Sequence, residues 1–193
     1  MYQICNHGFI EVVCGPMFAG KTEELLRRIK RLEIAKQKFL VFKPDVDNRY
    51  GDSEIVSHNK NSKNAISIKD SNDIYNYITD DLQVVVIDEA QFFDNKIIKV
   101  IDNLADKGLR VIVGGLDRNF RGEPFGPMPQ ILAIAEFVTK LTAICSVSGL
   151  PATRTQRLIN GKPANYHDPI VLIGAKESYE PRSRIHHEVP GKE

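Results

Sequence analysis

Cysteine is scarce in this sequence. Only Cys5, Cys14 and Cys145 occur among its 193 residues. An odd and sparse set of cysteines excludes a disulfide-stabilised scaffold and favours a reducing compartment. It also excludes an all-cysteine zinc ribbon, because such a site needs two Cys-x-x-Cys pairs.

The sequence also lacks a large net charge of either sign. Lys and Arg together number 26 and Asp and Glu number 25, which leaves a net charge of +1. The overall field therefore gives no reason to expect nucleic acid or a membrane surface as a partner. No apolar run approaches the roughly 20 residues of a membrane span, and the first residues lack the features of a signal peptide. We therefore expect a cytoplasmic protein.

Apolar runs alternate with amphipathic segments through most of the chain. This alternation predicts a parallel sheet with helices on both faces, within a P-loop α/β domain at residues 1–144. The predicted strands are 9–14, 39–42, 65–68, 82–87, 109–113 and 137–144. The predicted helices are 21–36, 72–77, 97–107 and 131–135, the third of them ended by Gly108.

Two stretches depart from this alternation. Residues 43–64 form a long polar loop with room for a short strand at 54–58, and long loops in compact domains are usually functional or mobile. Residues 145–193 are rich in turns, and we expect a small subdomain there. In it, residues 155–159 pair with 170–173 as a hairpin, and the chain frays from about Pro190.

A phosphate-binding motif follows the first predicted strand. The segment GPMFAGKT matches G-x-x-x-x-G-K-[ST] in full and opens the first predicted helix. Its backbone N–H groups and the helix N-terminus are suited to phosphate oxygens, its lysine to the β- and γ-phosphates, and its threonine hydroxyl to Mg²⁺. The predicted ATP-binding residues are Gly15, Pro16, Met17, Phe18, Ala19, Gly20, Lys21 and Thr22.

Two carboxylates, Asp88 and Glu89, directly follow the buried strand 82–87. In a P-loop protein an Asp at this place holds Mg²⁺, and the next residue lies close to the γ-phosphate. Glu89 is therefore a candidate base. It could activate water, which would make the protein an ATPase, or deprotonate a substrate hydroxyl, which would make it a kinase.

Three motifs together are similar to those of a known family. GPMFAGKT, DEAQFF (88–93) and GLDRNFRGEPFG (115–126) resemble the type II, cytosolic-type thymidine kinases, which commonly carry GPMFSGKT, DE[AG]QFF and G-L-D-x-x-F-x-x-x-P-F. The resemblance runs from about Gly8 to about His187. It implies transfer of the ATP γ-phosphoryl to the 5′-hydroxyl of thymidine, a RecA-like sheet, a small zinc-bearing lasso subdomain and a homo-oligomer, usually a tetramer.

The resemblance also assigns roles to single residues. Glu89 becomes the general base, Arg49 a phosphate-contacting arginine, and Ala90 and Gln91 join the ATP site with Lys21. The positions that match the thymine pocket are Met17, Phe92, Leu116, Phe120 and Phe125. The positions that match the closing lasso are Thr155, Ile170, Leu172, Gly174 and Tyr179. For each apolar residue the alternative is an ordinary core position, and for Arg49 it is a solvated loop arginine.

The sequence departs from the family at the zinc site. Members usually hold Zn²⁺ with a Cys-x-x-Cys pair and a Cys-x-x-Cys or Cys-x-x-His pair. Here the corresponding segments keep Cys145 and His186 but have Ser148 and Ser183 at the other two positions. A hydroxyl is a poor zinc ligand, and His187 could substitute only in part. We therefore expect a lasso without tightly bound zinc, held by packing or subunit contacts.

Two other function classes stay open from the residues themselves. A RecA-like ATPase shares the P-loop and the acidic pair, although the net charge gives no sign of a basic face for nucleic acid. A non-catalytic nucleotide-binding regulator is disfavoured, because Lys21, Thr22, Asp88 and Glu89 are all present.

Overall fold

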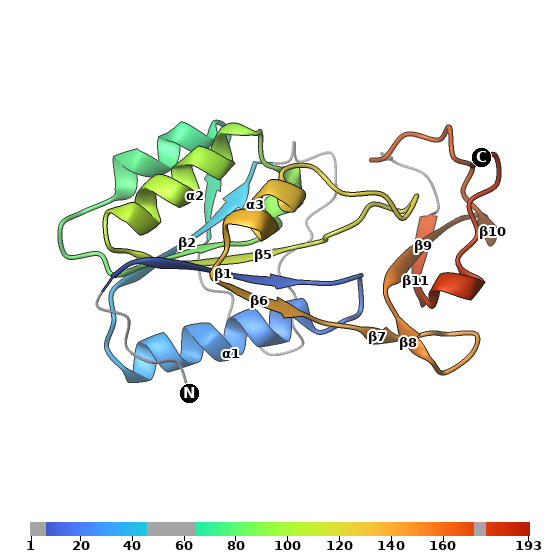
Figure 1. Ribbon diagram of the computed structural model, residues 1–193, viewed down its shortest axis with the longest axis horizontal. Helices are drawn as coiled ribbons and strands as arrows, with labels where there is room; N and C mark the ends of the chain where they lie inside the picture. The colour runs from blue at the N-terminus through green and yellow to red at the C-terminus, as the bar shows by residue number, and fades with distance from the viewer. Residues whose placement is uncertain (1–6, 46–64, 172–176) are drawn as a thin grey trace.

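The computed structural model describes residues 7–45, 65–171 and 177–193. Its main body is a six-stranded, wholly parallel sheet with the strand order β3-β2-β4-β5-β1-β6 (Figure 1). The predicted parallel α/β fold is therefore confirmed. The strands are β1 (Phe9–Cys14), β2 (Phe39–Pro44), β3 (Ile66–Ile68), β4 (Val84–Ile87), β5 (Arg110–Gly115) and β6 (Phe137–Lys140).

Helices cover both faces of this sheet, as the alternating pattern predicts. The α-helix α1 lies on one face, and α2 and α3 lie on the other (Figure 1). Their bounds are α1 (Lys21–Ile34), α2 (Lys96–Asp106) and α3 (Met128–Ile134). Short 3₁₀ turns occupy Ser71–Tyr77, Ala90–Phe92 and Arg184–His186, the first of them in place of the helix expected at 72–77. None of the helices in the described ranges combines the length and the apolar character needed to cross a membrane.

Strand periodicity decides which side chains each helix covers. Along β1, Ile10 and Val12 belong to the cluster under α2 and α3, whereas Val13 packs with Leu25 of α1. Successive strand residues point to opposite faces, so a run of apolar residues serves two cores at once. Each fully buried aliphatic side chain contributes about 1.5–3 kcal/mol relative to exposure.

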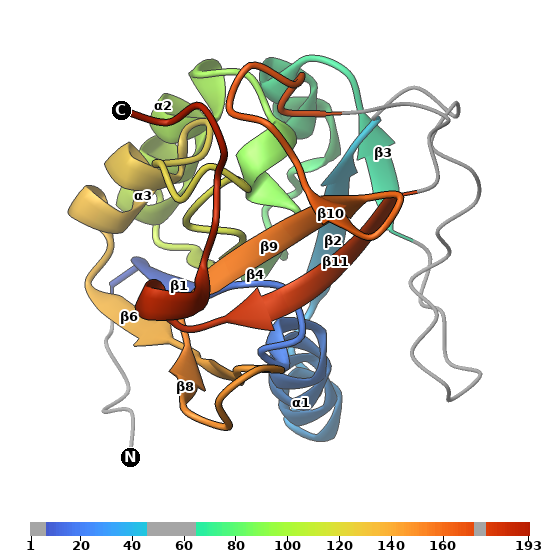
Figure 2. The ribbon, with the colours of Figure 1, turned by 90° about the vertical axis from the view of Figure 1, so that its right-hand side faces the viewer.

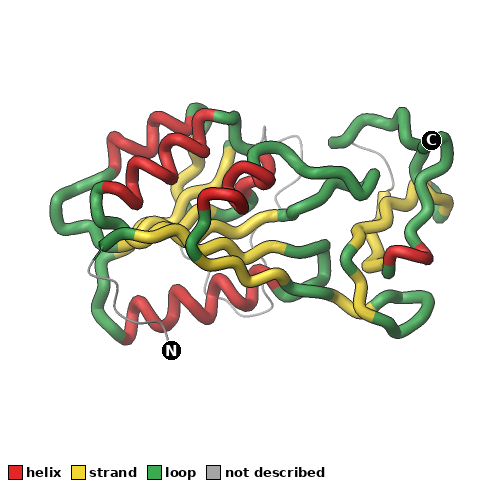
Figure 3. Tube along the Cα trace, in the orientation of Figure 1, coloured by secondary structure: helices red, strands yellow, loops and turns green. Residues whose placement is uncertain are grey.

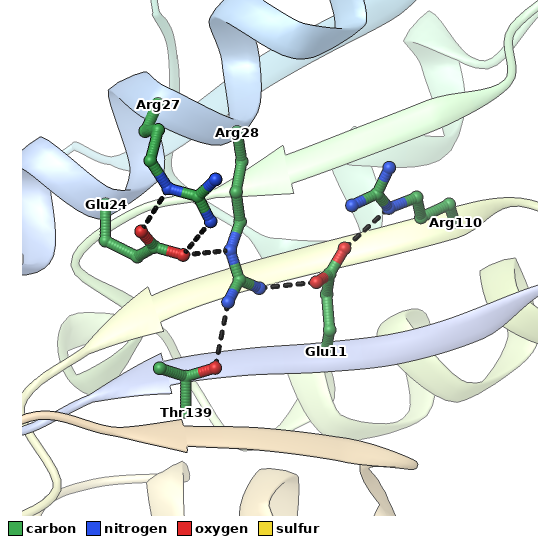
Figure 4. A network of polar contacts seen from close by, with 6 residues as sticks. All are labelled: Glu11, Glu24, Arg27, Arg28, Arg110 and Thr139. Atoms are coloured by element: carbon green, nitrogen blue, oxygen red, sulfur yellow. Dashed lines mark hydrogen bonds and ion pairs between the residues drawn. The ribbon is translucent and has the colours of Figure 1, made fainter. Parts of the chain in front are cut away.

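A charged residue interrupts the α1 face of β1. Glu11 lies fully buried between Arg28 of α1 and Arg110 of β5, and Arg28 also bonds Glu24 and Thr139 of β6 (Figure 4). This network joins α1, β1, β5 and β6. It fixes the helix that begins at the phosphate-binding motif.

The described residues that follow Ile144 (145–171 and 177–193), which we call the lasso subdomain, lie beyond the carboxyl ends of the sheet strands (Figures 1 and 2). Its strand β9 (Arg154–Ile159) pairs antiparallel with β11 (Glu177–Arg182) and with β10 (Lys162–Pro163). The predicted hairpin partner 170–173 is wrong at Ile170 and Val171, which form a bend, and residues 172–173 lie outside the described ranges. Apolar character alone had suggested that partner, whereas the register brings the more polar segment 177–182 onto β9.

Two further expectations differ from the structure. The strand expected at 137–144 is split into β6 and β7 (Ala143–Ile144), because the chain leaves the sheet edge there and pairs instead with β8 (Pro151–Ala152). The end of the chain, expected to fray from Pro190, is tied back. The Pro190 carbonyl accepts a hydrogen bond from the Tyr166 N–H (2.8 Å), and Lys192 Nζ donates to the Arg121 carbonyl (2.6 Å).

Candidate active site

The phosphate-binding loop lies between β1 and α1, at the side of the sheet that faces the lasso subdomain (Figure 3). Gly15 has φ +147°, and a Cβ there would lie 2.5 Å from the Leu141 carbonyl oxygen. Gly20 adopts a left-handed conformation (φ 82°) as the N-cap of α1. Glycine is needed at both positions because an L side chain would clash or strain the turn. The motif therefore forms a loop between a strand and a helix, as predicted, and the backbone of this loop requires its two glycines.

Three charged side chains interact at the bottom of this loop. Burial lowers the pKa of Lys21, although the charges of Glu89 and Asp88 act to raise it. Burial and the neighbouring charge of Glu89 raise the pKa of Asp88 from 3.8 to about 6. The structure thus brings together the lysine and both carboxylates that the two motifs predicted, although they lie 67 residues apart at Lys21 and Asp88. Perturbed pKa values of this kind are typical of functional sites.

Glu89 is held in an unusual conformation. Its φ of 52° is left-handed, which is rare for a residue other than glycine. Its carboxylate accepts a hydrogen bond from the Gln91 side-chain amide, and the Gln91 side-chain oxygen accepts one from the Leu116 N–H (2.9 Å). Gln91 and Ala90 are both buried. Gln91 therefore braces the candidate base against the end of β5, a role that the motif alone did not reveal.

The donor set at this place fits magnesium. Mg²⁺ prefers oxygen ligands, and in P-loop proteins a hydroxyl and a carboxylate supply them. Thr22 is the second residue of α1. Asp88 directly follows the buried strand β4, and its Oδ1 accepts a hydrogen bond from the Glu89 N–H (2.8 Å). The two adjacent carboxylates act on one half-buried lysine, and a bound cation would oppose both the burial and the Glu89 charge that raise the pKa of Asp88.

The residues expected to line the pocket for the thymine ring divide into two groups. Phe92 and Phe125 stack edge to face with their ring centroids 5.3 Å apart, and Leu116 is half-buried next to Gln91. Phe120, by contrast, is buried beneath the guanidinium of Arg157, which lies 3.7 Å from its ring centroid. The edge-to-face pair remains a candidate surface for a flat base, whereas Phe120 is engaged with the lasso.

A hydrogen bond joins the lasso to the phosphate-binding loop. The N–H of Met17 donates to the hydroxyl of Thr155 in β9 (3.0 Å). Tyr179 lies opposite Arg157 in the β9–β11 pairing, and Ile170 lies on an exposed bend. Thr155 therefore bonds the lasso to the P-loop, and Ala19 of the P-loop also packs against Cys145 and Ala152. Arg49, Leu172 and Gly174 lie outside the described residues.

The remnant zinc positions do not fit a zinc ion. The Ser183 hydroxyl is hydrogen-bonded to Nδ1 of His186 (2.9 Å). Burial acts to raise the pKa of the Cys145 thiol, but hydrogen bonds from the Ser148 hydroxyl and from neighbouring backbone N–H groups outweigh it, and the pKa falls from 9.0 to about 6. Within residues 7–45, 65–171 and 177–193, no group of three or more His, Cys, Asp and Glu side chains is placed to hold a metal. One thiol and one imidazole are too few ligands for a structural zinc.

His187 is engaged elsewhere. Its Nε2 donates to the carbonyl of Phe120 (2.8 Å), and burial lowers its pKa. The ring thereby joins the chain end to the loop after β5, and this bond gives it a structural role there. Nothing in the local sequence around His187 pointed to this contact, because its partner lies 67 residues away.

Comparisons with known proteins place the chain in a family. Among solved structures, domain III of the Thermotoga maritima replication initiation protein DnaA has 14% identity and a TM-score of 0.40, over 72% of this chain and 56% of that chain. The chain thus spans little more than half the length of that structure. A structure described as an ATPase has 12% identity and a TM-score of 0.44, over 92% of this chain and 79% of that chain. The sequence model of the thymidine kinase family matches residues 8–187, nearly the whole length, and the chain therefore belongs to the thymidine kinase family.

Proposed function

We propose that this protein transfers the γ-phosphoryl group of Mg-ATP to the 5′-hydroxyl of thymidine. Family membership supports a nucleoside kinase. The observation that carries the proposal is the position of Glu89, braced by Gln91 and next to the half-buried Lys21 and Asp88. A carboxylate fixed beside a phosphate-binding loop is suited to take a proton from an incoming hydroxyl.

The residues of the loop and of β4 would bind and orient the nucleotide. The ammonium of Lys21 now donates to the Pro16 carbonyl (2.8 Å), and in the complex it would turn to the β- and γ-phosphates. Thr22 and Asp88 would hold the Mg²⁺ of Mg-ATP, which supplies neutralisation of the phosphate charge when bound. Arg49 remains a proposed phosphate ligand on the strength of the family resemblance.

The nucleoside would lie between the aromatic pair and the lasso. Phe92 and Phe125 offer a surface on which a thymine ring can stack. Thr155 ties the lasso to the P-loop, so a bound nucleoside would be covered from both sides. A cover of this kind excludes water from the γ-phosphate and favours transfer to a hydroxyl over hydrolysis.

The test is ADP formation measured with and without thymidine. A kinase releases ADP in proportion to thymidine, and the product is thymidine monophosphate. Equal ADP release in both conditions would show an ATPase in which Glu89 activates water, and would refute the proposal. A panel of other nucleosides, deoxyuridine included, measures how strictly thymidine is preferred.

The role of Glu89 has its own test. The Glu89→Gln variant should lose about 100-fold or more in kcat because a positioned general base contributes at least that much. ATP binding should be retained, since the amide keeps the shape of the side chain. Asp102→Asn, which neutralises an exposed carboxylate of α2, serves as the matched control and should leave kcat unchanged. Full activity of Glu89→Gln would remove Glu89 as the base.

A further inference from the structure

A second concentration of positive charge is formed by residues outside the P-loop. A hollow of about 440 Å³ is lined by Arg121, Arg154, Arg184, His187 and Lys192, and we call it the arginine pocket. It shares no residue with the phosphate-binding loop. Its size falls within the range of pockets that hold small organic ligands, about 300–1,000 Å³.

The central arginine of this pocket is buried without a counterion. Arg154 is only 7% exposed, and its Nη1 reaches just the carbonyl (3.4 Å) and the hydroxyl (3.3 Å) of Thr153, both long hydrogen bonds. Burial and the charges of Arg118 and Arg184 lower its pKa, and the charge of Asp117 only partly opposes them. Among the described residues, no carboxylate forms an ion pair with Arg154 or Arg184. A buried and unpaired cation is costly, and an anion beside it would remove that cost.

The neighbouring arginine is fixed by other contacts. The guanidinium of Arg121 lies 4.6 Å from the centroid of the Tyr166 ring and donates to the Asp168 carbonyl (2.9 Å). Its Nε, however, is buried and has no hydrogen-bond partner. A buried donor without an acceptor is rare in proteins, so contacts within the described part of the chain leave Arg121 with incomplete hydrogen bonding.

The backbone leaves room for a ligand between these side chains. Gly122 also lines the pocket and has φ +76°. A Cβ at this position would lie 3.2 Å from Nε of Arg154 and 3.4 Å from a ring carbon of His187. Glycine therefore keeps the space next to the guanidinium of Arg154 open. The carboxylate of Glu193 also lines the pocket, but it forms no ion pair with any of these arginines.

We propose that the arginine pocket binds a small phosphate-bearing anion, either inorganic phosphate or the phosphate of a nucleotide, at a site separate from the P-loop. Guanidinium groups match phosphate oxygens in geometry and charge and can donate two parallel hydrogen bonds. The site combines several cations, and one of them is a buried arginine that forms no ion pair with a carboxylate of the described residues. These features go beyond what phosphoryl transfer at the P-loop requires.

The experiment measures binding of inorganic phosphate to the full chain by titration calorimetry, in the Lys21→Ala background, which weakens the contribution of the P-loop. Phosphate should still bind this protein. Arg184→Gln should weaken that binding about tenfold, and Arg154→Gln by at least as much, because each removes a charged hydrogen-bond donor. Arg31→Gln, which removes an exposed arginine of α1, should leave the affinity unchanged.

Several results would overturn the proposal. Absence of phosphate binding to the Lys21→Ala protein would do so, as would equal affinities in the arginine variants and the Arg31→Gln control. Arg184 is exposed, so its substitution stays informative even if Arg154→Gln fails to fold. Titration with ADP without Mg²⁺ distinguishes the two sources of the phosphate. ADP binding that is tighter than that of inorganic phosphate and is weakened by Arg184→Gln identifies a nucleotide, and equal binding identifies phosphate itself. Binding is measured rather than transfer, so failure here is distinguishable from failure of the proposed kinase activity.

Discussion

The buried network around Glu11 should be the most sensitive point of the α1 face. The side chains of Glu11 and Arg28 are 1% and 4% exposed, and Arg28 also donates to Glu24 and Thr139, both at 2.9 Å (Figure 4). In Arg28→Met the Glu11 carboxylate keeps only Arg110, whose Nε lies 2.5 Å away. Breaking a buried ion pair by removing one partner costs about 3–5 kcal/mol.

That loss is large for a protein of this size. Single domains unfold with a net free energy of about 5–15 kcal/mol, and at this length each kcal/mol shifts Tm by about 2–4 °C. We therefore expect Arg28→Met to lower Tm by roughly 6–20 °C. The chain has no tryptophan, so urea unfolding is followed by far-ultraviolet circular dichroism. The neighbouring variant Arg27→Met is the control, because Arg27 is 53% exposed and surface pairs are worth about 0–1 kcal/mol.

A double variant tests the reasoning directly. Glu11→Leu combined with Arg28→Met removes both buried charges and leaves Arg110, which is 24% exposed and can reach water. The double variant should lose clearly less stability than the two single variants together, since neither buried charge is left without its partner. Strict additivity would refute this account, as would a loss below about 1 kcal/mol for Arg28→Met.

Three other predictions concern the site and the lasso. Burial and Glu89 raise the pKa of Asp88 from 3.8 to about 6. Between about pH 4 and 6 the folded state therefore keeps a proton on Asp88 that the unfolded state has released, and the free energy of unfolding falls as pH rises through this range. Asp88→Asn should therefore stabilise the nucleotide-free protein at pH 7 by up to about 3 kcal/mol, with no gain at pH 4, while activity is lost; a destabilised variant at pH 7 would contradict this. Thr155→Val removes the acceptor for the Met17 N–H and should raise the KM for the nucleoside several-fold, whereas Thr155→Ser keeps it; equal KM values would exclude a role for this bond. Zinc after chelation should stay far below one per chain, and Ser148→Cys with Ser183→Cys should restore stoichiometric binding; stoichiometric zinc in the unmodified protein would show that the lasso is metal-bound after all.

Local sequence patterns predicted most of the fold. Apolar β-branched runs such as Val84–Ile87 and the apolar stripe of α1 report directly on burial, because strand and helix periods are properties of a few consecutive residues. Pairing in the lasso was mispredicted because β9 and β11 are separated by 17 residues, and their register depends on contacts that no local window contains.

In the candidate site, too, local motifs predicted some residues, and only the tertiary structure revealed others. Contiguous motifs identified Lys21, Asp88 and Glu89, because each lies directly at the end of a strand or at the start of a helix, where chain connectivity already fixes its place. The brace from Gln91 to Leu116 and the bond from Met17 to Thr155 join segments 25 and 138 residues apart, and no motif encodes them.

The sequence by itself determined a P-loop α/β fold, its nucleotide-binding motif and the loss of two zinc ligands, since each of these depends on residue type and short spacing. The tertiary structure alone decided where charge concentrates. A net charge of +1 gave no sign of a basic surface, yet folding brings Arg121, Arg154, Arg184 and Lys192 around one hollow. Composition sums charges over the whole chain, whereas binding depends on the few that folding brings within a few ångströms of each other.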